Sequence, residues 1–150
     1  MRRVVGVTFS GSYLPGSLLI QRATRYHFSH VAADLDNGEV IDATYSHGVA
    51  QRKLVYPGSG WQCSYLLSWT EKEQRGMFHL LTEQAGQPYD ILGALGVPLG
   101  ARWEESGKWF CSELIGACAQ RVGRLALSDK RIRRLSPEKL FGNLEGMIGK

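Results

Sequence analysis

The sequence predicts an α+β fold built on an antiparallel sheet. Two observations carry this prediction: strand patterns joined by a hairpin signal fill the first half of the chain, and helix patterns dominate the second half. The length of 150 residues and the hydrophobic content of 43% are typical of a globular domain with its own core. No internal repeat or long linker divides the chain, so residues 1–150 are predicted to form a single domain.

Strands are predicted mainly in the first half. Residues 4–9 form a β-branched apolar run, which predicts a buried strand. After a turn, Pro15 favours a short helix to about Arg22, with Leu18 and Leu19 directed inward. Four further segments carry strand patterns: residues 29–35, 39–44, 49–55 and 62–69.

Helices are predicted mainly in the second half. Thr70 and Glu73 form a capping-box pattern that opens a helix to about Ala85, and the turn signal at 86–88 ends it. Residues 90–109 are rich in glycine and irregular. Two further helices are expected, one over residues 111–122, ended by Gly123, and a short one from Ser136.

Cys111 lies where a polar loop turns into the clearest of these helices. A thiol at a helix N-terminus lies among unpaired backbone N–H groups at the positive end of the dipole, which stabilises the thiolate. Cys111 is therefore the first candidate for a nucleophile. The alternative is that it begins a buried apolar stripe shared with Leu114, Ile115 and Cys118.

The register of the first hairpin selects a partner for this cysteine. A three-residue loop at positions 36–38 (Asp-Asn-Gly), with its glycine left-handed, collects the apolar side chains on one face, whereas a two-residue loop mixes them with charged ones. The three-residue loop places Ala32 opposite Asp42 and His30 opposite Thr44. Asp42 is then diagonal to His30 on the same face, within side-chain reach.

A cysteine nucleophile usually needs a base, most often a histidine. The chain has four, all before Cys111: His27, His30, His47 and His79. The hairpin favours His30 as the base, with Asp42 fixing its tautomer and stabilising the imidazolium. The alternative is that His30 and Asp42 form a surface pair on a solvated strand face.

The remaining cysteines are expected to serve packing. Cys118 lies within the apolar stripe of its helix, and Cys63 alternates with Tyr65 and Leu67. The odd number of cysteines argues against a disulfide framework. No Cys-x-x-Cys or His-x-x-x-His spacing occurs, so no metal site is predicted, and no cofactor is expected.

The net charge of +4 comes in part from a late basic cluster: Arg121, Arg124, Lys130, Arg131, Arg133 and Arg134. Such a cluster can attract nucleic acid, cell-wall polymers or lipid headgroups, but a solvated charged face is commoner, and no nucleic acid partner is expected. No signal peptide or membrane span is predicted, so the protein is expected to be cytoplasmic as synthesised. A phage lysis system or a secretion apparatus would provide a route to a cell wall.

Three motifs together resemble the circularly permuted NlpC-like (YiiX/YaeF-like) branch of the papain-like cysteine hydrolase superfamily. Residues 86–93 are similar to its Gly-x-Pro-Tyr segment, residues 110–114 to its Cys-Ser-x-Leu motif, and residues 29–32 with 40–43 to its "SHV…VIEA" pattern. The resemblance covers roughly residues 4–122 and implies a papain-like fold in which the cysteine helix packs on a small antiparallel sheet. Permutation explains why the histidine precedes the cysteine.

The resemblance also implies an activity. It implies a cysteine peptidase or amidase that forms a thioester acyl-enzyme on peptide, peptidoglycan or acyl-amide substrates, with Tyr89 lining the site and helping to bind the oxyanion. Lecithin:retinol acyltransferase relatives share the order of histidine and cysteine, so an acyl-lipid hydrolase or acyltransferase is an alternative. A catalytically silent basic binding module is another. The sequence departs from the family at Asp42, Phe110 and Glu113, where Glu, Asp and Gly are common.

Overall fold

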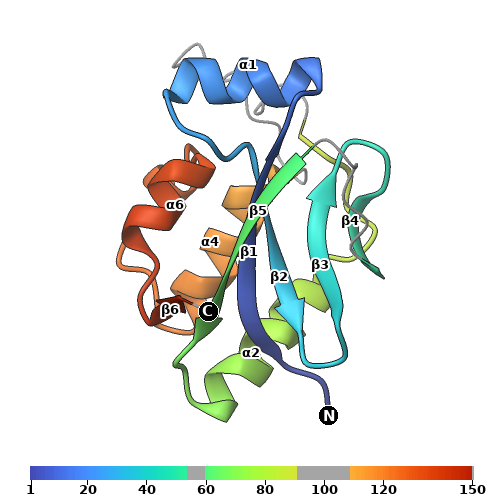
Figure 1. The fold of residues 1–150 in the computed structure, drawn as a ribbon. Coiled ribbons are helices and arrows are strands. Elements are labelled where there is room, and N and C mark those ends of the chain that lie inside the picture. Colours follow the sequence, from blue (N-terminus) through green and yellow to red (C-terminus); the bar gives the residue numbers. More distant parts are fainter. Residues whose placement is uncertain (54–59, 91–108, 150) are drawn as a thin grey trace.

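The computed structural model describes residues 1–53, 60–90 and 109–149 and has one six-stranded sheet in that part of the chain (Figure 1). The strands are β1 (Val4–Ser12), β2 (His30–Leu35), β3 (Glu39–Thr44), β4 (Gly48–Lys53), β5 (Gly60–Leu67) and β6 (Met147–Gly149). Their order across the sheet is β4-β3-β2-β1-β5-β6, and every neighbouring pair is antiparallel. The predicted antiparallel sheet is thus confirmed.

Five helices cover this sheet within the described ranges: α1 (Pro15–Thr24), α2 (Glu71–Glu83), α4 (Cys111–Arg121), α5 (Asp129–Ile132) and α6 (Pro137–Asn143). Helix α4 packs on β2 and β3, and Figure 1 shows it behind the sheet with α6 beside it. The core between them is dry, since Phe9, Val31 and Ile41 of the sheet and Leu114 and Ile115 of α4 are at most 1% exposed. This packing places the N-terminus of α4 near the start of β2.

The register of the β2–β3 hairpin follows the sequence prediction. Ala33 lies opposite Ile41 and Asp34 opposite Val40, which leaves a three-residue loop at 36–38. Gly38 has a φ of +83°, the left-handed conformation expected of the glycine. This register therefore puts Asp42 opposite Ala32 and diagonal to the first residue of β2.

Helix α1 docks with the opposite face from the one predicted. Leu18 and Leu19 are 43% and 50% exposed, so their predicted inward orientation is wrong. Hydrogen bonds determine this orientation. The Gln21 side-chain amide donates to the carbonyl of Ser12 at 2.9 Å, and the Ser17 hydroxyl accepts from the Ser12 backbone N–H at 3.0 Å. Because these hydrogen bonds hold the polar side of α1 against the end of β1, its leucines face outward.

Other boundaries differ little from expectation. Helix α4 ends at Arg121, one residue early, and α1 continues to Thr24. Helix α5 and strand β6 were not predicted, because three or four residues carry no periodicity. The end of the fourth predicted strand, at 54–55, and nearly all of the irregular stretch, at 91–108, lie outside the described residues.

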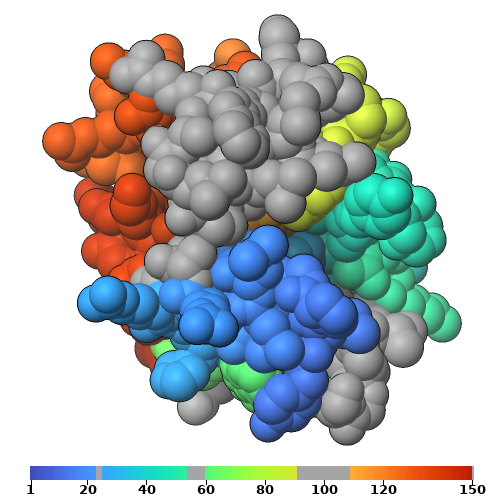
Figure 2. Space-filling view, turned by 90° about the horizontal axis from the view of Figure 1, so that it is seen from above, coloured from blue at the N-terminus to red at the C-terminus, as the bar shows by residue number. Residues whose placement is uncertain are grey.

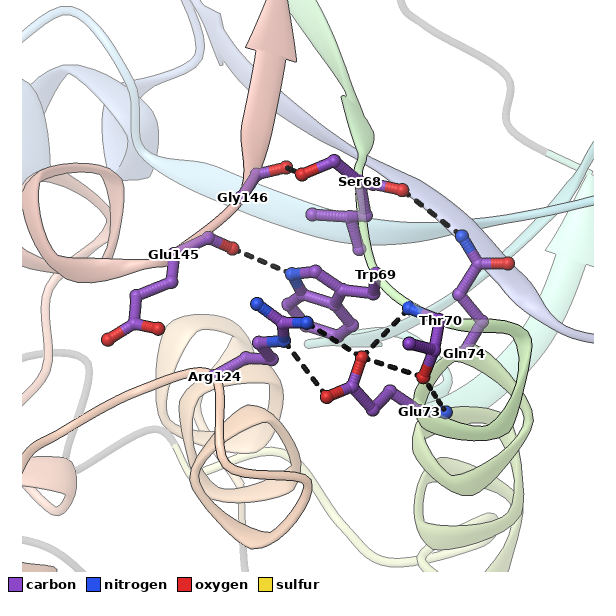
Figure 3. Close-up of polar contacts among 9 residues, drawn as sticks. Ser68, Trp69, Thr70, Glu73, Gln74, Arg124, Glu145 and Gly146 are labelled. Carbon is purple, nitrogen blue, oxygen red and sulfur yellow. Dashed lines mark hydrogen bonds and ion pairs between the residues drawn. The ribbon is translucent and has the colours of Figure 1, made fainter.

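The N-terminus of α2 is the centre of a polar network (Figure 3). The predicted capping box is present: the Thr70 hydroxyl accepts from the Glu73 backbone N–H at 3.3 Å, and the Glu73 carboxylate accepts from the Thr70 backbone N–H at 2.8 Å. Arg124, which follows α4, donates to both Glu73 oxygens at 3.1 and 2.9 Å. The Trp69 indole donates to the Glu145 carbonyl at 2.7 Å. The network ties α2, α4 and the segment before β6 together.

We expect this network to make the fold sensitive to acid. Hydrogen bonds from Arg124 and Thr70 lower the pKa of Glu73 from 4.5 to about 2. A lowered pKa stabilises the folded state above about pH 4.5, and this stabilisation is lost as the pH falls toward 2. Urea unfolding followed by tryptophan fluorescence should show a shallower acid loss of unfolding free energy in Glu73→Gln than in wild type.

The control for this prediction is Glu71→Gln in the same turn. The Glu71 side chain is 54% exposed, and its ion-pair partners among the described residues are Arg3 and Arg75, whose side chains are also exposed. This variant should therefore keep the acid dependence of wild type. Equal acid profiles for Glu73→Gln and wild type would contradict the prediction.

Candidate active site

The start of α4 is held by a short backbone pairing with the segment that follows α2. The Trp109 backbone N–H donates to the Pro88 carbonyl, and the Asp90 N–H donates to the Trp109 carbonyl, both at 3.0 Å. Between these two bonds Tyr89 lies against Phe110, with ring centroids 6.0 Å apart. Tyr89 is thereby placed beside the first turn of α4.

Cys111 is the first residue of α4. Phe110 before it is extended (φ −87°, ψ 148°) and no side chain caps the helix. The backbone N–H at this first helical position has no acceptor within the helix. Cys111 itself is 0% exposed.

The structure brings the three predicted residues together in a chain of contacts. The charge of Cys111 and hydrogen bonding to its thiol raise the pKa of His30, the first residue of β2, so the thiol lies beside the imidazole. His30 Nε2 lies 2.7 Å from Asp42 Oδ2. The His30 side chain is 24% exposed and that of Asp42 is 0% exposed, so the pair does not lie on a solvated strand face.

Asp42 has a second partner that the sequence analysis missed. Arg52 on β4 donates from Nε to Asp42 Oδ1 at 3.0 Å and from Nη2 to Asp42 Oδ2 at 2.6 Å. The register of β3 and β4 places Ala50 opposite Asp42 and Arg52 opposite Val40, so Arg52 is diagonal to Asp42. Assigning the turn before Gly48 would have fixed the register of β3 and β4. The argument that paired His30 with Asp42 would then have paired Arg52 with Asp42 as well.

The charges around His30 favour its protonated form. Burial lowers the pKa of His30, but the negative charge of Cys111 and hydrogen bonds to Asp42 and Cys111 outweigh it and raise the pKa from 6.5 to about 10. Burial raises the pKa of Asp42, but His30 and Arg52 outweigh it and lower the pKa below its usual range. At neutral pH the three partners are therefore a carboxylate, an imidazolium and a guanidinium.

Tyr89 keeps its proton at every physiological pH. Burial raises its pKa above the usual value of 10, and the charges of Cys111, Asp90 and Glu113 raise it further. Tyr89 lines the same cavity as His30, which places the phenol near the proposed base. A protonated phenol is a hydrogen-bond donor, which is what a developing oxyanion needs.

The other two cysteines differ from Cys111 in their surroundings. Cys118 is 5% exposed, and burial raises the pKa of its thiol to about 12. The Cys63 thiol lies 3.2 Å from the hydroxyl of Tyr65 on β5. Cys118 is therefore a buried packing residue, as predicted, whereas Cys63 is only partly buried. Neither thiol has a hydrogen bond to a histidine among the described residues.

A cavity of about 410 Å³ opens beside His30 and Tyr89. Most of its lining surface is apolar. The described lining residues are Ser12, Leu14, Gly16, Ser17, Leu19, Ile20, Ser29, His30, Ala43, Thr44, Tyr45 and Tyr89. Figure 2 shows the end of the molecule on which α1 (blue) lies. Residues of α1, among them Leu19, and Tyr45, which is 76% exposed, form part of the wall of this cavity.

A comparison with solved structures identifies the fold. The chain is similar to "metalloprotein yiiX from Escherichia coli O157:H7, DUF1105", with a TM-score of 0.72 and 18% identity, over 99% of this chain and 96% of that one. The predicted papain-like α+β fold is thereby confirmed. No protein-family model matches the sequence, and no curated protein matches it.

The residues at this site do not fit a metal ion. In the parts of the chain that the structure describes, no three or more His, Cys, Asp or Glu side chains are grouped so that they could hold one. Both Asp42 oxygens are engaged by the Arg52 cation, which would repel a metal. Within the same ranges, no helix is both long and apolar enough to cross a membrane.

We expect the Asp42 carboxylate to be required for the high His30 pKa. Asp42→Asn removes its charge and leaves at most a neutral hydrogen bond, so the His30 pKa should fall by about 1–3 units. An NMR titration of the imidazole between pH 5 and 11 measures it. Asp36→Asn, which removes an exposed carboxylate near the hairpin loop, is the control and should leave the His30 pKa unchanged. An equal pKa in Asp42→Asn and wild type would refute the assignment.

Proposed function

We propose that the protein is a cysteine hydrolase that cleaves an amide or ester bond through a thioester acyl-enzyme. The observation that supports it best is the contact chain from Cys111 through His30 to the buried Asp42 carboxylate. A nucleophile, a base and an orienting group in this order form the catalytic arrangement known from cysteine and serine hydrolases.

The chemistry would run in two halves. His30 holds the thiol proton, and the Cys111 thiolate attacks the carbonyl carbon to form a C–S bond. As the tetrahedral intermediate collapses, the C–N or C–O bond breaks and the His30 imidazolium gives its proton to the leaving group. His30 then takes a proton from water, hydroxide attacks the thioester, the C–S bond breaks, and the acid product leaves.

Two donors are available for the oxyanion of each intermediate. The backbone N–H of Cys111 has no acceptor within its helix, and the Tyr89 phenol keeps its proton. Because Cys111 is fully buried, the attack also requires the surrounding side chains to open a path to the sulfur. The cavity lined by His30 and Tyr89 is the approach nearest to these groups.

The resemblance to NlpC-like hydrolases makes a peptide or other amide the first substrate class, with peptidoglycan peptides as one example. Transfer of the acyl group to an amine or alcohol in place of water would use the same thioester. Adding such an acceptor and analysing the products separates transfer from hydrolysis.

We expect Cys111 to be the thiol that iodoacetamide labels first near neutral pH. Its partner His30 stays protonated to about pH 10 and so stabilises the thiolate, whereas Cys118, with a pKa of about 12, is only about one part in 10⁵ thiolate at pH 7. Labelling from pH 5 to 9, mapped by peptide mass spectrometry, should show selective modification of Cys111.

The control pair for this experiment is His30→Asn and His47→Asn. His30→Asn removes the imidazole next to the thiol and should abolish the selectivity, whereas His47 is exposed and its loss should not alter it. Equal labelling of Cys111 and Cys118, or no labelling of Cys111, would contradict the hydrolase. A catalytically silent binding module would then be the better interpretation.

A second candidate function is hydrolysis or transfer of an apolar acyl group, as in an acyl-lipid hydrolase or acyltransferase. The specific observation in its favour is the lining of the cavity beside His30, where Leu14, Leu19, Ile20 and Tyr45 face the space that a substrate would enter. Apolar walls favour an acyl chain over a polar peptide through the hydrophobic effect.

A chain-length series of p-nitrophenyl esters tests this candidate. An apolar acyl site predicts that kcat/KM rises from acetate to octanoate. Leu19→Gln should lower kcat/KM for octanoate by about tenfold and leave that for acetate unchanged. Leu66→Gln is the control, since Leu66 is similarly exposed (44%) and lies on β5 outside the cavity lining. A flat series, or equal effects of the two variants, would leave the amide hydrolase as the better proposal.

A further inference from the structure

A second cavity, of about 520 Å³, lies in the last part of the chain and does not share a described lining residue with the first. It is formed by the turn after α4, helix α5 and helix α6. Its described lining residues are Leu127, Ser128, Lys130, Arg131, Arg134, Leu135, Lys139 and Asn143. Four of these eight side chains are cations, and none is an acid. Three residues of the late basic cluster, Lys130, Arg131 and Arg134, therefore line this cavity.

The four cations are not neutralised within the described residues. None of Lys130, Arg131, Arg134 and Lys139 has a side-chain nitrogen within 4.0 Å of a carboxylate oxygen of a described residue. The neighbouring acid Asp129 accepts instead from the Gln120 amide at 3.0 Å, and it lines a different cavity. Like charges gathered around one cavity repel one another, so an anion bound there would lower the free energy of the folded protein.

The wall of this cavity is anchored to the core. Leu135, which is 1% exposed, packs against Gly116 of α4, and its carbonyl accepts from the buried Ser112 hydroxyl. The cations of α5, of α6 and of the turn between them therefore surround a site whose wall is fixed to the core.

We propose that this cavity binds a phosphate-bearing anion. Two guanidinium groups and two ammonium groups provide the planar forks and point charges that recognise phosphate oxygens. The phosphate can belong to a small soluble phosphate or to the headgroup of an anionic phospholipid, and both share the same oxygens. The site is independent of Cys111, His30 and Asp42.

Calorimetric titration of the full chain with inorganic pyrophosphate at 20 mM and 150 mM NaCl tests the proposal. Wild type should bind one equivalent with saturation, more weakly at the higher salt. Arg131→Gln with Arg134→Gln should raise the Kd about tenfold or more, because charge-assisted hydrogen bonds are lost. Arg22→Gln with Lys72→Gln removes the same net charge from exposed positions on α1 and α2 and should leave the Kd unchanged.

Vesicle sedimentation distinguishes the two sources. Phosphatidylglycerol vesicles that bind wild type and the α1/α2 control, but not the cavity variant, identify a lipid headgroup; pyrophosphate binding alone identifies a soluble phosphate.

Circular dichroism of the cavity variant verifies its fold, and if that variant is misfolded Lys139→Gln replaces it. Failure of both probes to bind wild type, or equal losses in cavity and control variants, overturns the proposal. Iodoacetamide labelling of Cys111 is measured separately, so either proposal can fail alone.

Discussion

The buried carboxylate of Asp42 is the constraint on which the candidate site depends. A fully buried charge is tolerated only with partners, and Asp42 has two: the imidazole of His30 and the guanidinium of Arg52. Asp42 and its two partners come from three neighbouring strands, so sheet order and register must both be right for the carboxylate to be neutralised. Removing either partner would leave the buried carboxylate with one cation in place of two. The same arrangement that holds β2, β3 and β4 in register therefore fixes the imidazole in place.

The proposed nucleophile, Cys111, is positioned by backbone hydrogen bonds at the start of α4. The start of α4 is defined by the backbone pairing of Trp109 with the segment around Tyr89, while its side rests on β2 and β3. A helix that packs along a sheet can slide or rotate, but the two bonds at 3.0 Å hold its first residue at the end of the sheet. The Cys111 thiol and the Tyr89 phenol are thereby positioned near the His30 imidazole. The candidate site is thus assembled from strand register on one side and a helix terminus on the other.

The two cavities differ in character, and each difference has a local cause. Helix α1 docks through the hydrogen bonds of Ser17 and Gln21, which leaves its leucines outward and makes the wall beside His30 apolar. Around α5 and α6 the buried positions are Ile132, Leu135 and Leu140, and Lys130, Arg131, Arg134 and Lys139 beside them line one cavity. An apolar surface and a cationic surface on one domain suit ligands of different chemistry.

The sequence by itself determined the sheet type, the capping box of α2, the start of α4 and the β2–β3 register, because local periodicity and turn chemistry control each of them. That register was enough to pair His30 with Asp42. The Arg52–Asp42 pair also follows from strand register, once the turn before Gly48 is known. Tertiary structure alone decided that α1 turns its polar side inward, that Cys111 is buried, and that four late cations surround a cavity. These features depend on how separate helices and strands dock against one another, and the periodicity within one element does not encode which neighbours its side chains will meet.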